Sequence, residues 1–252
     1  MTELSWWTAP AGAPSDRPAA RSAPPHPTLH SGVFEELGRS IATGDVPPGT
    51  VFTLERLEAH FGVSRTVARE AIRVLESMNL VSGRRRVGIT VQPTSSWHVF
   101  DPQVIRWRLS GAGRDDQLRS LTALRSAVEP PASAAAAQAA TEEQRRRLVE
   151  LSEEMTRTGE AGDLDTFLEQ DIEFHRLVLA GSGNEMFAAL SDVVAEVLAG
   201  RTEYHLMPTR PRPEALAGHR AVARAIAAGH GPDAETAMRA VVTEVAEVLA
   251  RP

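Results

Sequence analysis

The sequence predicts a mainly α-helical protein, with an N-terminal winged helix-turn-helix (α with a small β wing) followed by an all-α antiparallel helical bundle. In the first third, three segments with helical periodicity precede two short β-leaning pieces joined by a run of arginines. In the remainder, amphipathic helical runs are separated by glycine and proline, without strand-like alternation. An apolar fraction of 42% is enough to build a hydrophobic core in each part.

The composition of the whole chain narrows the class of protein. A length of 252 residues fits two domains of ordinary size. The absence of cysteine excludes disulfides, thiolate metal sites and cysteine nucleophiles. We find no apolar run long enough to cross a bilayer and no signal peptide, so we expect a cytoplasmic protein that does not contact membranes.

Composition and periodicity divide the chain into four parts. Residues 1–27 are rich in proline, alanine and serine, which predicts a disordered tail. Residues 28–93 carry the winged helix-turn-helix pattern. Residues 94–113 are expected to be a linker, and residues 114–252 to form an all-helical domain for effector binding and dimerisation.

Helix-capping residues place the central helices of the first domain. Thr53 is a suitable N-cap for a helix that Gly62 ends, and Ser64 caps the helix that follows. The β-leaning pieces at 80–81 and 89–91 complete the pattern of a helix, a helix-turn-helix and a hairpin. This order of elements is typical of a winged helix.

The helix beginning after Ser64 has the pattern of a DNA-reading helix. Arg65 and Arg69 lie one turn apart on the exposed face, while Val67, Ala71 and Val74 lie toward the opposite side. Arginine near the start of such a helix can bind guanine bidentately or hold a phosphate. The alternative interpretation is an ordinary amphipathic helix with solvated arginines.

The net charge of −6 conceals a local basic excess around this helix. Between Phe61 and Val91 there are six arginines and only two glutamates. Arg84, Arg85 and Arg86 lie between the two β-leaning pieces, where they would supply charge for phosphates or the minor groove. A nucleic-acid surface needs local positive potential, whatever the average charge of the chain.

The segment Leu29 to Val91 resembles the winged-helix domain of the GntR regulators. The family motif GVSRTxxREAhRxLE is matched from Gly62 through Glu76, and the family's rrvG wing is matched from Arg85 through Gly88. The resemblance implies that Ser64, Arg65, Thr66 and Arg69 contact bases and phosphates, and that the wing around Arg85 and Gly88 reaches a groove. The downstream half resembles the all-helical effector domain of the FadR subfamily.

One position departs from the family pattern. GntR regulators usually open the preceding helix with Ser-Glu-Arg, and that arginine contacts DNA. Here the three residues are Thr53, Leu54 and Glu55, and Arg56 lies one place later. We therefore do not assign this contact to the chain.

In the second domain, an aspartate and two histidines occupy inward-facing helical positions. Asp171 and His175 lie one turn apart among apolar neighbours, and His219 lies on a similar apolar stripe. A buried carboxylate and imidazole are costly unless they are paired or bound, and this combination suits Zn²⁺, Ni²⁺ or Mn²⁺. A hydrogen-bonded core pair is the alternative interpretation of Asp171 and His175.

The metal-binding branch of the FadR-type domains resembles this pattern and uses a fourth ligand, a histidine in the last helix. That position falls on Val241, which cannot bind metal. The resemblance therefore implies an incomplete site, in which water or effector completes the shell, or an empty one. His205 would substitute only if its helix faced inward.

Arg125 is the candidate effector-binding residue. The segment from Leu124 through Pro130 resembles the family's "LR..lEp.aa" pattern, in which the arginine faces the effector. An arginine directed into a helical domain is suited to clamp a carboxylate, so a small organic acid is the expected ligand. The connector and the segment from Arg119 through Leu121 resemble regulators of sugar-acid catabolism, which implies a sugar acid such as gluconate or galactonate as the narrower expectation. The alternative is a surface arginine paired with Glu129 one turn later.

These features predict a homodimeric transcriptional regulator, a repressor, that binds double-stranded operator DNA and responds to a small carboxylate effector. A metal-responsive DNA-binding sensor is the first alternative. A metal-dependent enzyme that uses the aspartate and the two histidines is the second, but the sequence contains no recognisable constellation of a general acid or base to accompany them. We therefore expect a protein that is not an enzyme.

Overall fold

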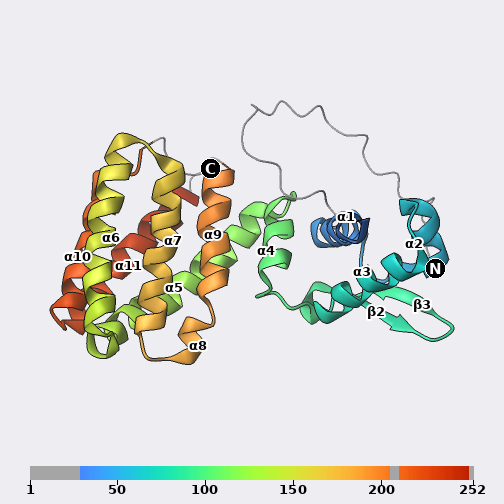
Figure 1. Ribbon diagram of the computed structural model, residues 1–252, viewed down its shortest axis with the longest axis horizontal. Helices are drawn as coiled ribbons and strands as arrows, with labels where there is room; N and C mark the ends of the chain where they lie inside the picture. Colours follow the sequence, from blue (N-terminus) through green and yellow to red (C-terminus); the bar gives the residue numbers. More distant parts are fainter. Residues whose placement is uncertain (1–28, 205–209, 250–252) are drawn as a thin grey trace. The chain divides into compact units, whose positions relative to one another are not determined.

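The computed structural model describes residues 29–204 and 210–249, drawn as coloured ribbon in Figure 1. The tail predicted at 1–27 and the position of His205 lie outside these residues. The chain divides into two compact units, residues 1–111 and 112–252, and each is considered by itself. Within the described residues, none of the helices has both the length and the apolar character that a membrane span requires.

The N-terminal unit is a winged helix-turn-helix, as the sequence predicted. Its strands form one antiparallel sheet in the order β1-β3-β2, in which Val51 pairs with Thr90 and Val81 with Val91. The elements of this unit are α1 (Leu29–Thr43), β1 (Val51–Phe52), α2 (Leu54–Phe61), α3 (Arg65–Ser77), β2 (Val81–Arg84), β3 (Gly88–Val91), the 3-10 helix η1 (Thr94–Ser96) and α4 (Pro102–Leu109).

The predicted caps set the turn between α2 and α3. The Thr53 hydroxyl accepts a hydrogen bond from the backbone N–H of Arg56 at 3.3 Å, and the Ser64 hydroxyl accepts one from Val67 at 3.4 Å. Gly62 ends α2 in the left-handed region with φ 63°, which a residue without Cβ adopts without strain. The sequence therefore placed both helix starts correctly.

The inner face of α3 differs from the prediction by a partial turn. Ala68, Ala71, Ile72 and Leu75 are buried in the core of the winged helix, whereas Val67 and Val74 are only half-buried. The predicted inner face is therefore confirmed at Ala71, and Val74 packs against the same core at its edge, whereas Val67 is only half-buried. The small alanines at inner positions are compatible with the packing of α3 against α1.

The segment predicted as a linker contains α4, which packs on α1. The indole N–H of Trp107 donates to Glu35 at 2.9 Å, and a Cβ at Gly38 would overlap the Trp107 ring. The ring of Phe34 lies 5.0 Å from that of Trp107, between centroids. The compact N-terminal unit therefore extends beyond residue 93 and includes α4.

The C-terminal unit is a bundle of helices around an apolar core, as predicted (Figure 1). Its central helix, α5, packs against α11, α7 and α10. Apolar side chains from α5, α6, α7, α10 and α11 form one continuous cluster, and a smaller cluster joins α5, α7 and α9. The helices are α5 (Arg114–Ala139), α6 (Glu142–Ala161), α7 (Leu164–Gly181), α8 (Glu185–Ala188), α9 (Ser191–Glu203), α10 (Pro213–Ala227) and α11 (Gly231–Leu249).

A single arginine of α6 ties together the ends of two other helices. Arg145 donates to the carbonyl oxygens of Ala137 at 2.8 Å and Ala140 at 3.0 Å, at the end of α5. It also donates to Ile226 at 3.0 Å, at the end of α10. The last carbonyls of a helix have no partner within the helix, so Arg145 satisfies acceptors that would otherwise depend on water.

Candidate functional site

The exposed face of α3 presents the side chains that the sequence assigned to DNA. Arg65 is the first residue of α3, and Ser64, Arg65, Thr66 and Arg69 are all exposed. The apolar side of the helix is fixed in the core, so these side chains occupy the outer face near the helix N-terminus. This arrangement offers several donors to the edges of bases or to phosphates.

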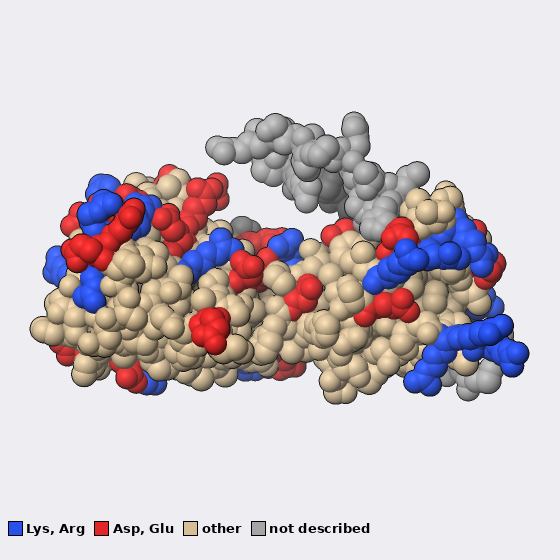
Figure 2. Space-filling view, turned by 60° about the horizontal axis from the view of Figure 1, so that its bottom comes forward, with Lys and Arg blue, Asp and Glu red and all other residues tan. Residues whose placement is uncertain are grey.

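The wing is a hairpin formed by β2 and β3. Arg84, Arg85 and Arg86 are exposed there, and Figure 2 shows basic side chains spread over the N-terminal unit (right), with acidic ones among them. Gly88 has φ 108°, and a Cβ at this position would lie 2.9 Å from the carbonyl oxygen of Phe52. Gly88 is therefore required by the backbone path of the wing and by its close approach to β1.

Arg65 has an acidic partner that the sequence did not predict. Its Nη1 lies 2.8 Å from Oε1 of Glu55 and 3.7 Å from Oε1 of Glu58, both on α2. Hydrogen bonds from its own backbone N–H and from Arg65 lower the pKa of Glu55. The spacing of ten residues between Glu55 and Arg65 gave no helical signal, because the pair crosses the turn between two helices.

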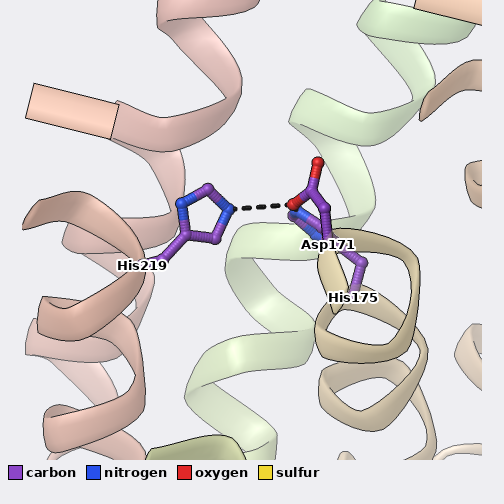
Figure 3. Close-up of side chains that lie close together, drawn as sticks. All are labelled: Asp171, His175 and His219. Atoms are coloured by element: carbon purple, nitrogen blue, oxygen red, sulfur yellow. Dashed lines mark ion pairs between the residues drawn. The ribbon is translucent and has the colours of Figure 1, made fainter. Parts of the chain in front are cut away.

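The C-terminal unit brings together the three residues predicted to bind metal. Asp171 and His175 of α7 face His219 of α10, as Figure 3 shows. The Nε2 atoms of His175 and His219 lie 3.3 Å and 3.1 Å from Oδ1 of Asp171. One ligand atom from each residue falls within a group no wider than 4.8 Å, and all three residues are buried.

The other ring nitrogens of the two histidines face acceptors. Nδ1 of His219 lies 2.8 Å from the backbone oxygen of Ala215, within hydrogen-bond geometry. Nδ1 of His175 lies 2.7 Å from Oε2 of Glu129, an ion-pair contact whose angle falls outside that of a hydrogen bond. At His219 the acceptor at Nδ1 favours the proton on that nitrogen and leaves Nε2 as the ligand atom, which is the usual second shell of a metal-bound histidine.

Arg125 lies beside this cluster and is fully buried. Its Nε is 2.5 Å and its Nη2 3.2 Å from the two carboxylate oxygens of Glu129, and both side chains are only 1% exposed. Nη2 also lies 3.4 Å from Nε2 of His175. The alternative interpretation, in which Arg125 pairs with Glu129, is therefore confirmed for the pairing. It is wrong about the location, because the pair is buried and not at the surface.

Charge and burial act in opposite directions on the buried groups. Burial raises the pKa of Glu129, but the charges of Arg125 and His175 outweigh it and lower that pKa to about 2. Burial likewise raises the pKa of Asp171, and the two adjacent imidazoles hold it well below its usual range. Burial lowers the pKa of His175, but Glu129 and Asp171 raise it overall. Both carboxylates are therefore ionised at neutral pH.

The residues present fit a divalent metal with open coordination positions. Oδ1 of Asp171 and Nε2 of His219 are buried without a hydrogen-bond partner, which is the state expected of preformed ligand atoms. Val241 is buried on α11, and its Cγ2 lies 2.7 Å from where a Cβ on Gly218 would stand, so it packs against α10 at the residue that precedes His219. Three protein ligands leave coordination positions of the ion that water or an exogenous ligand would fill.

Further polar atoms on α5 are also buried without partners. They are Nη1 of Arg125, Oγ1 of Thr122 and Oε1 of Gln117. Thr122, Gln117 and the burial of Glu129 were not predicted from the sequence. The spacing of Arg125 and Glu129 was a visible signal for the pair, but it does not distinguish a buried pair from an exposed one.

Two family models match most of the described chain. Residues 29–91 match the family described as bacterial regulatory proteins of the gntR family, and residues 120–244 match the FCD domain. The first match covers the winged helix, and the second covers the helices that carry Arg125, Asp171, His175 and His219.

Similar proteins are transcription regulators. The galactonate operon transcriptional repressor of Escherichia coli is 28% identical over 217 residues, which cover 85% of this chain and 93% of the repressor. The regulator LutR of Bacillus subtilis is 28% identical, covering 83% of this chain and 95% of LutR. A solved structure of Lar, described as controlling the Listeria monocytogenes agr system, has a TM-score of 0.56 at 18% identity and covers 88% of this chain and 96% of Lar, which supports the fold.

Proposed function

This chain belongs to the GntR family of bacterial transcriptional regulators and carries an FCD domain, and on that premise we propose that it is a repressor whose operator affinity is controlled by a small organic acid. The acid binds in the C-terminal unit, at the buried cluster of Arg125, Asp171, His175 and His219. The protein acts in the cytoplasm as a homodimer that presents two winged helices to the half-sites of an operator.

The single observation that carries this proposal is the buried cluster itself. Arg125 is the largest fully buried side chain of the molecule's described part, and its Nη1 has no hydrogen-bond partner. An unpaired buried donor is costly, and a ligand carboxylate would satisfy it. Thr122, with its own unpaired hydroxyl three residues before Arg125, offers a polar contact suited to a hydroxylated acid.

We further propose that Asp171, His175 and His219 hold a divalent metal such as Zn²⁺, Ni²⁺ or Mn²⁺. When bound, the metal would supply a Lewis-acidic position for an oxygen of the effector. With His175 and His219 neutral, as metal ligands are, Asp171, Glu129 and Arg125 together leave one net negative charge, and a divalent ion would convert this to one net positive charge. A monoanionic acid would neutralise that charge, so metal and Arg125 favour the same ligand class.

The acid can alter DNA binding only through different affinities for two states of the protein. If it binds more tightly to the state in which the two winged helices do not fit both half-sites, operator affinity falls as the acid concentration rises. A tenfold loss of operator affinity requires a tenfold difference in acid affinity between the states, about 1.4 kcal/mol. The galactonate operon repressor among the relatives favours a sugar acid as the first ligand to examine.

A metal-responsive regulator, with the ion itself as effector, is the second candidate. Oδ1 of Asp171 and Nε2 of His219, which lie 3.1 Å apart and have no hydrogen-bond partner, favour it, because they offer ligand atoms before any acid is present. The two candidates predict different titrations. Metal alone would change operator affinity in the metal-responsive case, whereas metal would act only together with an acid in the first.

The DNA-binding part is tested by selection of duplexes from a random library, followed by fluorescence anisotropy on the selected and a scrambled duplex at several salt concentrations. We expect selective binding that Arg65→Ala and Arg69→Ala each weaken at least about tenfold, and a salt slope that falls by about 0.9 for each phosphate that the variant no longer neutralises. Arg239→Ala, which removes an exposed arginine of α11 paired with Glu235, is the control. Failure to select any sequence would contradict the proposal.

The metal is tested by elemental analysis after loading with Zn²⁺, Ni²⁺ or Mn²⁺ and dialysis. We expect about one equivalent per chain, with a large loss in Asp171→Asn and in His219→Gln. His230→Gln, which changes an exposed histidine, should keep the metal. Wild-type protein that retains no ion after loading would refute the metal site without affecting the DNA-binding proposal.

A further inference from the structure

We infer that Glu55 determines the sequence selectivity of the DNA-reading surface by positioning the guanidinium of Arg65. The inference rests on the proposed role of α3 as the reading helix. It goes further by assigning a role to an acidic residue on a surface that binds a polyanion. Glu55 acts through Arg65 and is a positioning residue.

The geometry of the pair leaves Arg65 able to bind a second partner. Glu55 lies in the first turn of α2, and its Oε1 accepts from Nη1 of Arg65 at 2.8 Å. A guanidinium has five N–H donors in one plane, so an acceptor at Nη1 fixes the orientation of the plane while most donors stay available. Glu58, 3.7 Å from the same nitrogen, adds a second negative charge on the same side of Arg65.

In the protein without DNA, the pair is too weak to lock Arg65. The side chains of Arg65 and Glu55 are 54% and 63% exposed, and exposed ion pairs contribute little to stability. Against a duplex the same pair is partly shielded from water, so the attraction becomes stronger and the orientation of Arg65 narrows. Glu55 therefore affects the binding of DNA and has little effect on the stability of the free protein.

The carboxylates also oppose binding to phosphates. A negative charge beside Arg65 cancels much of the attraction of that arginine for the DNA backbone, which every sequence offers equally. A base edge that accepts two hydrogen bonds, such as O6 and N7 of guanine, still binds a correctly oriented guanidinium through both bonds. Glu55 thus weakens sequence-independent contacts more than base contacts, which raises selectivity.

The departure from the family pattern supports this assignment. Glu55 occupies the position where the resemblance to GntR regulators places a DNA-contacting arginine. An acidic residue there differs from arginine by two charges and cannot hold a phosphate. Because Glu55 contacts Arg65, the negative charge at this position acts on a neighbouring arginine instead of on DNA.

The test compares wild type, Glu55→Gln and Glu235→Gln on the selected and the scrambled duplex by fluorescence anisotropy. Glu235 forms a similarly exposed pair with Arg239 at 2.7 Å in the other unit, so its variant controls for the change of net charge. We expect Glu55→Gln to tighten binding to the scrambled duplex and to lower the ratio of the two affinities at least about fivefold. The salt slope on the scrambled duplex should become steeper by about 0.9 if Arg65 neutralises one more phosphate.

A second comparison separates positioning from simple repulsion. In an Arg65→Ala background, Glu55→Gln should leave the affinity ratio unchanged, because the positioned group is absent. An unchanged ratio in the single variant, or the same change of ratio in both backgrounds, would overturn the inference. If wild type itself binds both duplexes equally, the proposed function fails and this inference fails with it.

Discussion

The buried pair of Arg125 and Glu129 makes a quantitative prediction about the stability of the C-terminal unit. Glu129→Leu would leave the guanidinium of Arg125 buried without its carboxylate partner. Removing one partner of a buried ion pair destabilises a protein by about 3–5 kcal/mol, whereas replacing both by apolar residues of similar size is often close to neutral. We therefore expect Arg125→Met/Glu129→Leu to be more stable than Glu129→Leu alone by at least about 2 kcal/mol.

The assay is urea unfolding followed by two probes. Residues 112–252 contain no tryptophan, and Trp97 and Trp107 are buried in the N-terminal unit, so the change of tryptophan fluorescence on unfolding reports that unit. Far-UV circular dichroism is dominated by the longer helices of the C-terminal unit. The variants should shift the transition seen by circular dichroism and leave that seen by fluorescence unchanged.

Two results would refute this reasoning. A loss below about 1 kcal/mol in Glu129→Leu would mean that the charge of Arg125 is not isolated from water as the structure describes. A double variant no more stable than the single one would mean that Arg125 contributes chiefly through packing and not through its charge. Either outcome would also remove the physical argument for a ligand carboxylate at Arg125.

Three further predictions concern stability. Arg145→Met should destabilise the C-terminal unit by about 2–3 kcal/mol in urea unfolding, because four backbone carbonyls lose a charged donor. Arg146→Met, which changes the exposed neighbouring arginine, should destabilise it by less than about 1 kcal/mol. Equal losses of stability in the two variants would contradict the capping role of Arg145. Ser64→Ala should destabilise the N-terminal unit by about 1 kcal/mol, measured by tryptophan fluorescence, and an unchanged midpoint would argue against the cap. In metal-free protein, the contribution of Glu129 is present above its unfolded pKa of about 4.3 and is lost as pH falls toward its folded pKa of about 2. Stability measured by circular dichroism should therefore decline over that range, with a shallower decline in Glu129→Gln.

The winged helix could be predicted in detail because local chemistry determines it. Capping residues at 53 and 64, the glycine at 62 and the arginine run of the wing each require a particular local backbone or exposure. Strand β1 escaped prediction because two residues are too few to produce an alternating pattern. Helix α4 looked like a connector because the burial of Trp107 depends on a missing Cβ at Gly38, 69 positions earlier in the chain.

The site of the C-terminal unit could be predicted only in part. Asp171 and His175 share a helix and lie one turn apart, so their common face follows from the helical period. The resemblance to the FadR subfamily related His219 to them across the chain. The burial of Glu129 could not be foreseen, because the following segment of α5 is rich in alanine on every side and its sequence does not indicate which face is inward.

Glu55 illustrates a different limit of sequence reasoning. Its departure from the family pattern was visible, but its contact with Arg65 depends on the angle between α2 and α3 at Gly62. Pairs that cross a helix-turn-helix have no fixed spacing along the chain. The structure therefore supplied the partner of Glu55, and the sequence supplied only the reason to look for one.

The measurement that tests the account most directly is anisotropy of the selected operator duplex with metal-loaded protein, titrated with galactonate and gluconate. The account predicts that one of these acids weakens duplex binding by wild type at least about tenfold, and that Arg125→Lys, which keeps the charge but loses the planar fork, shifts the required acid concentration upward. Arg239→Ala should respond as wild type does. Release by metal alone, or equal release from the Arg125 variant, would contradict the claim that an acid bound at Arg125 controls the operator.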